Sequence, residues 1–103
     1  MFVILSEINV KDGFGEQALQ FYQTPGEMER SPGFLGIDFL KVTGAAADIE
    51  RFVGYTRWET MEHFQSWMKS DAYRQSAQGG VPDYIMSHKV TLCELVAHKA
   101  PIG

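Results

Sequence analysis

Two kinds of side chain in this sequence can do chemistry with little help from a larger motif: an indole and two imidazoles. Trp67 lies in the segment FQSWMKSDAY, nine residues after Trp58. An indole at the edge of a cavity can stack on a planar aromatic ligand, whereas an indole inside a core only fills space. His63 and His88 could each act as a general base or bind a metal. Neither has a carboxylate partner at motif spacing, so solvated histidines are the alternative.

The residues around Trp67 predict a helix. Thr60 is a suitable N-cap, and Met61, Phe64 and Met68 recur at helical spacing after it. On a helical wheel Trp67 lies about 60° from the centre of this apolar stripe. Its ring can therefore pack on the core while its N–H faces a cavity or water. Both interpretations, core residue and cavity residue, remain open at this point.

The composition limits the classes of protein that this chain can belong to. It has 103 residues, of which 45% are hydrophobic and 21% charged, and its net charge is -4. These values predict one globular domain over residues 1–103 and argue against binding to nucleic acid. Cys93 is the single cysteine, which excludes an internal disulfide. The sequence shows no signal peptide and no membrane span, and we expect a cytoplasmic protein.

Apolar patterns and turn residues predict one domain in which strands and helices follow one another along the chain. Strands are expected over residues 2–10, 34–42, 50–58 and 89–97. A helix from Gly15 should end near Thr24 and Pro25, with a short helical turn to about Arg30. The second helix follows Thr60, a further turn is expected over residues 70–75, and residues 98–103 are expected to be a frayed tail. The order is the ferredoxin-like β-α-β-β-α-β fold, an α+β class in which two helices cover one face of a four-stranded antiparallel sheet.

Both faces of the predicted sheet are apolar. In the first strand Phe2, Ile4 and Ile8 point to one face, while Val3 and Leu5 point to the other. Two helices can cover only one face, so the second is expected to pack against another sheet. A second copy of the chain supplies that sheet most simply, which predicts a homodimer. Scattered apolar residues on a monomer surface are the alternative.

Two segments resemble a known family. The segment SPGFLG over residues 31–36 and the segment RFVGYTRWETMEHFQSWMKSDAYR over residues 51–74 are similar to the antibiotic biosynthesis monooxygenase superfamily of dimeric α/β barrels. Within it, the resemblance is closest to the small bacterial heme-degrading monooxygenases. It covers the chain from Phe2 to about Ala97. The resemblance implies an oxygenase acting on a planar aromatic ligand, with heme as a possible substrate or cofactor.

Three side chains define the site in the heme-degrading members: an asparagine in the first strand, a tryptophan in the second helix and a histidine that ligates the iron. Trp67 occupies the tryptophan position, and the asparagine position falls at Ser6. The histidine position falls at Ser76 or Ala77, so the axial imidazole is missing. Asn9 is expected on the opposite strand face from Ser6. The resemblance thus implies Trp67 and Ser6 as catalytic residues and leaves His63 and His88 as candidate ligand-binding groups.

The superfamily also contains cofactor-independent oxygenases of quinols and polyphenols. Such a site needs an apolar cavity with a few polar groups that hold a phenol. The chain offers side chains of suitable types at Trp67, Ser6 and Arg57. We also predict that the ligand is bound by Phe64, Tyr22, Tyr55 and Tyr73. Two further alternatives are a non-catalytic dimeric barrel that binds a small ligand, and an isomerase or decarboxylase with His63 or His88 as its base.

Overall fold

The computed structural model describes residues 1–103, apart from the side chain of Ala77. Four strands form one antiparallel sheet in the order β2-β3-β1-β4. The elements follow the predicted alternation, so the ferredoxin-like α+β prediction is confirmed. Their bounds are β1 (Phe2–Lys11), α1 (Gly15–Gln23), η1 (Glu27–Arg30, a 3-10 helix), β2 (Phe34–Lys41), β3 (Ile49–Trp58), α2 (Met61–Met68), α3 (Asp71–Gln78) and β4 (Ile85–Glu94).

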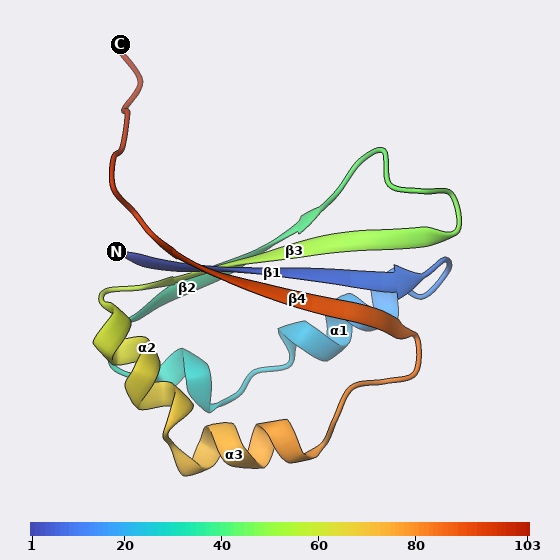
Figure 1. Ribbon diagram of the computed structural model, residues 1–103, viewed down its shortest axis with the longest axis horizontal. Helices are drawn as coiled ribbons and strands as arrows, with labels where there is room; N and C mark the ends of the chain where they lie inside the picture. Colours follow the sequence, from blue (N-terminus) through green and yellow to red (C-terminus); the bar gives the residue numbers. More distant parts are fainter.

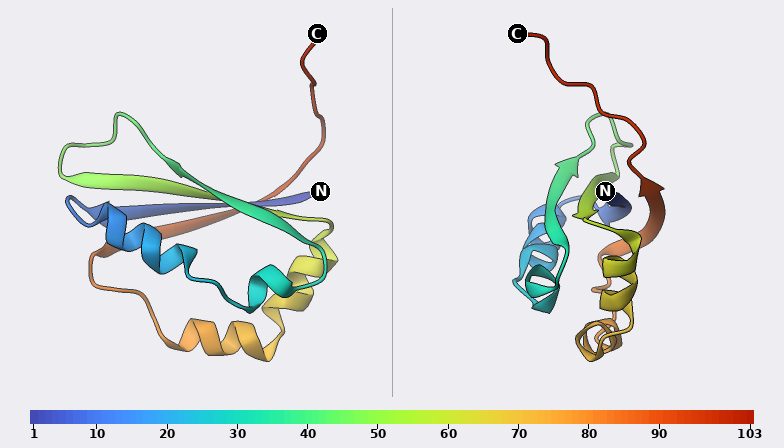
Figure 2. Two further views of the ribbon diagram at one scale, coloured as in Figure 1. Left: turned by 180° about the vertical axis from the view of Figure 1, so that it is seen from behind. Right: turned by 90° about the vertical axis from the view of Figure 1, so that its left-hand side faces the viewer.

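All the helices lie on one side of the sheet. Figure 1 shows α1, α2 and α3 below the four strands, and in the end-on view of Figure 2 α1 lies to one side and α2 and α3 to the other. The 3-10 helix η1 contacts α3. We call this side of the sheet the helix face, and the opposite side the outer face.

The core on the helix face is divided into two clusters at opposite ends of the sheet. One is built around α1 and contains Ile8, Val10, Ala18, Phe52 and Ile85. The other is built around Trp58, which is fully buried, with Phe2 and Ile4 beside it and Met28, Phe34, Phe64 and Trp67 packed against it. The middle of the sheet lies between the two clusters.

Glu50 of β3 joins the sheet to the start of α1. Its carboxylate accepts hydrogen bonds from the backbone N–H groups of Gly15 at 2.9 Å and Gly13 at 3.1 Å, and it pairs with Lys41 at 3.3 Å. Partial burial alone would raise the pKa of Glu50, but these bonds and the lysine charge hold that pKa below its ordinary value. The residue before α1, Phe14, provides no side-chain cap. Glu50, which lies in β3, therefore caps the start of α1 in place of Phe14.

Two elements differ from the sequence-based expectation. β4 begins at Ile85, four residues before the predicted start, so His88 lies inside a strand and not in the preceding loop. The segment after Ser70 is a complete helix, α3, and not a single turn. Ser70 accepts a hydrogen bond from the backbone N–H of Tyr73, which makes it the N-cap that starts this helix.

The outer face and the chain end lie away from the helices. Figure 1 shows the segment after β4 running away from the sheet on its outer side, and its residue Val96 is 89% exposed. The outer face carries the half-buried side chains Leu5, Val53 and Tyr55. In the part of the chain that the structure describes, no helix has the length and apolar character needed to cross a membrane.

Candidate functional site

The inward face of α2 is rotated from the predicted stripe. Met61 is 46% and Met68 is 38% exposed, whereas Phe64 and Trp67 are half-buried against the Trp58 cluster. The expectation that Met61 and Met68 form the core side of this helix is therefore wrong. The helix is short, and contact with Phe2 and Trp58 fixes its rotation through Phe64. Trp67 and Phe64 together form the inward side of α2.

Trp67 and Tyr73 form an aromatic pair across the bend between α2 and α3. Their ring centroids are 5.9 Å apart with an interplanar angle of 73°. Ser70 holds the bend, because its hydroxyl donates to the carbonyl oxygen of Trp67 at 2.6 Å and accepts from the N–H of Tyr73 at 3.2 Å. Two aromatic side chains from different helices are thus held in an edge-to-face arrangement. Both were predicted site residues, and the structure brings them together.

The middle of the helix face is lined by small and apolar side chains. Ser6 of β1 pairs with Gly54 of β3 on one side and with Val90 of β4 on the other. Directly paired residues of antiparallel strands share a face, and Ser6 alternates with the buried Ile4 and Ile8. Ser6 therefore lies on the helix face, halfway between the two core clusters. Gly54 is buried, and the side chains of Ser6, Phe39 and Ile37 lie 3.6–3.8 Å from the position that a Cβ atom would occupy there.

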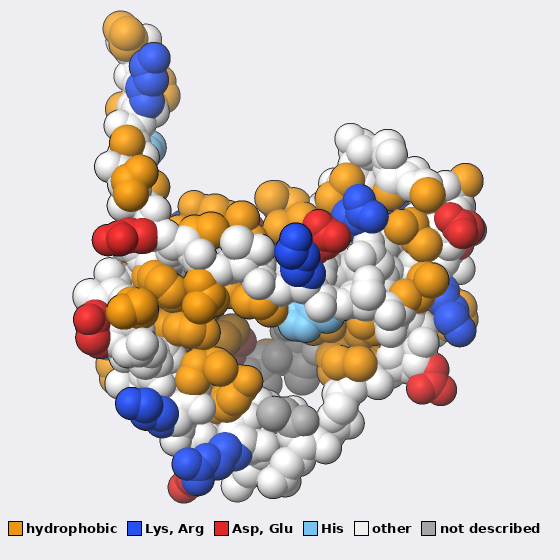
Figure 3. All heavy atoms as spheres, in the orientation of Figure 1, with side chains coloured by type: hydrophobic (Ala, Val, Ile, Leu, Met, Phe, Trp, Pro, Cys, Tyr) orange, Lys and Arg blue, Asp and Glu red, His pale blue; other side chains and the backbone are white. Residues whose placement is uncertain are grey.

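A hollow lies between this part of the sheet and α3. Figure 3 shows the surface depressed between β4 and α3, beside α2. On the helix face of β4, Val90 is 49% and Leu92 is 56% exposed, although both pair with inward residues of β1. The main contacts of α3 are with α2 and η1. The helix therefore stands off from the strands and leaves an apolar floor uncovered.

The floor residues Val90 and Leu92 were not predicted as site residues. The sequence does indicate that they share a strand face, because His88, Val90 and Leu92 alternate with Lys89 and Thr91 in β4. The alternation places them on one face, but only the structure reveals that no helix covers that face. We define the hollow by its floor, Ser6, Val90 and Leu92, and regard Trp67 and Tyr73 as its helix wall.

His63 lies at a different place, a groove between η1 and the two helices α2 and α3. This groove has a volume of about 380 Å³, and its lining includes Arg30, His63 and Trp67. The Nδ1 atom of His63 is 2.7 Å from the hydroxyl oxygen of Thr60. The ring packs so closely on Gly33 that a side chain there would overlap it. His63 is thus held in place by local packing, and Trp67 also lines this groove.

Tyr22 and Phe64 belong to the two core clusters. Tyr22 packs against the α1 cluster, and within the described residues its buried hydroxyl has no hydrogen-bond partner. Burial, together with the nearby Tyr84, raises the pKa of the Tyr22 phenol. Phe64 lies 5.5 Å from Phe2 between ring centroids. Both side chains pack in the core, Tyr22 on the cluster at α1 and Phe64 on the cluster at Trp58.

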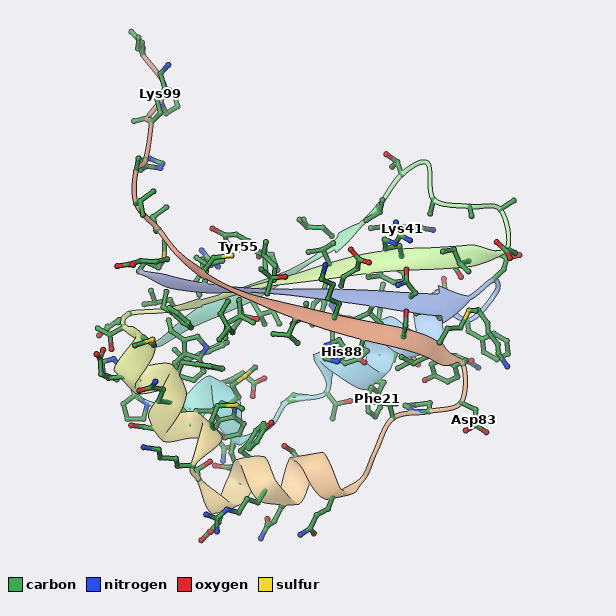
Figure 4. The ribbon with its side chains drawn as sticks, viewed as in Figure 1. Phe21, Lys41, Tyr55, Asp83, His88 and Lys99 are labelled. Atoms are coloured by element: carbon green, nitrogen blue, oxygen red, sulfur yellow. The ribbon has the colours of Figure 1, made fainter. Side chains whose placement is uncertain are left out.

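Tyr55 and Arg57 lie on the outer face, away from Trp67. Figure 4 shows Tyr55 above the strands and His88 below β4, on the side of the helices. The guanidinium of Arg57 lies 5.9 Å from the centre of the Tyr55 ring and 3.6 Å from Asp38. Alternation along β3 separates these residues from the buried Thr56 and Trp58. The sequence-based grouping of Tyr55 and Arg57 with Trp67 in one cavity is therefore not reproduced.

Two positions of the resembled heme site can be compared directly. Asn9 lies on the outer face, as expected, where it donates to Ser87 at 2.8 Å and accepts from Arg51 at 2.7 Å. Ser76 lies on α3 and its hydroxyl donates to the carbonyl oxygen of Tyr73 at 2.8 Å. The side chain of Ala77, the alternative histidine position, lies outside the described residues. Across the residues described, no cluster of three His, Cys, Asp or Glu side chains is arranged to hold a metal ion.

Comparisons with known proteins agree on one family. The model of the family "antibiotic biosynthesis monooxygenase" matches residues 1–79. A heme-degrading monooxygenase of Bacillus thuringiensis subsp. konkukian (strain 97-27) is 33% identical over 105 residues, covering 100% of this chain and 97% of that protein.

Solved structures show the same fold. A Bacillus cereus protein described as an antibiotic biosynthesis monooxygenase has a TM-score of 0.82 at 22% identity, covering 99% of this chain and 97% of that one, which is a likeness of fold. The heme-degrader MhuD from Mycobacterium tuberculosis, with two hemes bound in its active site, has a TM-score of 0.72 at 26% identity. It covers 97% of this chain and 100% of its own.

Proposed function

The chain belongs to the antibiotic biosynthesis monooxygenase family, and we propose that it oxidises a planar aromatic substrate, heme, in the hollow between β4 and α3. The observation that carries the proposal is the pairing of an uncovered apolar floor with an aromatic wall. Val90 and Leu92 form the floor, and Trp67 and Tyr73 form the wall. The 33% identity with a heme-degrading relative supports the choice of heme.

The residues of the hollow suit a flat, largely apolar molecule. When a ring system covers the floor, apolar surface is removed from water. This burial stabilises the complex by about 25 cal/mol per Å² of apolar surface. The indole of Trp67 offers a face or edge for stacking. The hydroxyl of Ser6 can donate a hydrogen bond to a polar group of the substrate at the middle of the sheet. Trp67 and Ser6 are the residues that we expect to touch the reacting part of the substrate.

Hemin titration and turnover test this proposal. A monooxygenase inserts one atom of O₂ into its substrate and reduces the other to water with two electrons, so the assay includes ascorbate as reductant. We expect a shifted, saturable Soret band near one equivalent of hemin per chain, and loss of that band under O₂ and ascorbate. Bovine serum albumin with hemin under the same conditions controls for uncatalysed destruction. Absence of a saturable Soret shift would refute the heme substrate.

A second substrate class is favoured by the absence of an imidazole at Ser76. In α3 the hydroxyl of Ser76 is engaged with the backbone of Tyr73, and the Trp67–Tyr73 pair provides an aromatic wall suited to a polycyclic phenol. In this alternative the protein is a cofactor-independent quinol monooxygenase. Oxygen uptake with a naphthoquinol substrate above the autoxidation rate would support it. Uptake equal to autoxidation would exclude that substrate.

We also propose that the outer face packs against a second copy of the chain. Leu40 is 53% exposed on this face, and Leu5, Val53 and Tyr55 are only half-buried. A family of dimeric barrels suggests a sheet-on-sheet interface. Light scattering at micromolar concentration is expected to give twice the mass of the 11.6 kDa chain. A stable folded monomer would contradict the dimer.

A further inference from the structure

The chain has three histidines, and the structure assigns them very different surroundings. His98 lies in the extended segment after β4 and is exposed. His63 is fixed through its Nδ1 atom by Thr60 and lies against Gly33, beside the groove at η1. His88 lies inside β4. Only His88 is on the strand that forms the floor of the hollow.

The sheet register directs His88 toward the hollow. It pairs directly with Ile8 of β1, which is 2% exposed on the helix face. Two residues further along β4, Val90 pairs with Ser6 at the middle of the same face. A residue and its diagonal neighbour on the paired strand lie about 7–8 Å apart, so the imidazole of His88 lies within one side-chain length of the floor. Figure 4 shows His88 below β4 on the helix side, and the matching view in Figure 3 shows an imidazole at the edge of the depression.

The ring of His88 is free to bind a ligand. Within the residues that the structure describes, neither of its ring nitrogens takes part in a hydrogen bond, in contrast to Nδ1 of His63. The side chain is also exposed. The imidazole is therefore accessible at the rim of an apolar hollow.

We propose that His88 supplies the imidazole that coordinates the heme iron, from the sheet side of the hollow. This inference rests on the proposed heme substrate. A neutral imidazole nitrogen is the usual strong protein donor to heme iron. The hydroxyl of Ser76 on α3 is a poor donor, and it is already bonded to the backbone carbonyl of Tyr73. The iron ligand therefore comes from β4 in this chain, and the helix side contributes aromatic rings.

The test compares four proteins that differ at one histidine each. Hemin is titrated into the wild-type chain and into His88→Ala, His63→Ala and His98→Ala, followed by absorption and by electron paramagnetic resonance of the ferric complex. In His88→Ala we expect the histidine-ligated ferric spectrum to be lost and the affinity for hemin to fall at least 10-fold. His63→Ala and His98→Ala should retain both. Adding imidazole to His88→Ala should restore the wild-type spectrum.

The outcomes separate this inference from the function on which it rests. If His88→Ala binds hemin with the wild-type spectrum, the ligand assignment is wrong while the heme substrate stands. If none of the four proteins binds hemin, both are wrong. Loss of the spectrum in His63→Ala instead would move the ligand to the groove at η1 and overturn the assignment. His88→Gln, which keeps the size of the side chain but is a weak iron ligand, gives the same answer if the alanine variant folds poorly.

Discussion

Replacing Trp58 by alanine is expected to lower the free energy of unfolding by about 4 kcal/mol. The indole is 0% exposed and lies at the centre of the cluster that joins β3 to α2 and η1. Its ring centroid is 5.4 Å from that of Phe34 and 6.1 Å from that of Phe64, both in edge-to-face geometry. Truncation removes these contacts and leaves a cavity that the surrounding strand cannot fill.

The loss is large compared with the roughly 5–15 kcal/mol that stabilises a typical domain. Urea unfolding followed by far-ultraviolet circular dichroism, at one fixed protein concentration, measures it. Trp58→Phe is the matched control. Within the described residues the indole N–H of Trp58 has no hydrogen-bond partner, so phenylalanine forfeits volume but no bond. We expect it to cost about 1–2 kcal/mol. A Trp58→Ala variant within about 1 kcal/mol of wild type would show that this cluster is not a main source of stability.

The order of the elements was predictable because each one depends on local patterns. The apolar patterns over residues 2–10 and 50–58 are long, and Thr60 is a strong helix start. The structure confirms Thr60 as an N-cap, since its side chain accepts from the N–H of His63. The start of β4 was missed, because residues 85–88 contain a methionine, a serine and a histidine, which are weak strand formers. Hydrogen-bonded pairing with β1 stabilises this part of β4, although its local strand propensity is weak.

The site was only partly predictable, because its geometry depends on contacts between elements. The inward rotation of α2 follows from the packing of Phe64 on Phe2 and Trp58, which no helical wheel contains. The pairing of Trp67 with Tyr73 requires the bend at Ser70. The open floor of the hollow results from α3 standing away from the sheet. Periodicity indicates which face a residue occupies, but it does not indicate whether that face is covered.

Replacing Trp67 by phenylalanine is expected to reduce heme turnover at least 10-fold, equivalent to about 1.4 kcal/mol of transition-state stabilisation. The indole lies in the wall of the hollow and is half-exposed, in contact with Tyr73. Phenylalanine keeps an aromatic ring against the Trp58 cluster but has a smaller face and no N–H. The free energy of unfolding should therefore change by less than about 1 kcal/mol. Turnover under ascorbate and urea unfolding are measured on the same preparation.

The Trp58→Phe and Trp67→Phe variants can be compared in two properties, the free energy of unfolding and heme turnover. They belong to the same cluster, yet Trp58 is fully buried and Trp67 is only half-buried. A residue that only fills the core should lose stability when changed to phenylalanine and keep its turnover per folded molecule, as we expect for Trp58→Phe. When a residue that touches the substrate is changed to phenylalanine, the protein should keep its stability and lose turnover. If Trp67→Phe loses more stability than Trp58→Phe and retains wild-type turnover, Trp67 is a core residue and the wall of the hollow has no role in the reaction. The opposite pattern requires that substrate binds against the half-exposed indole of Trp67.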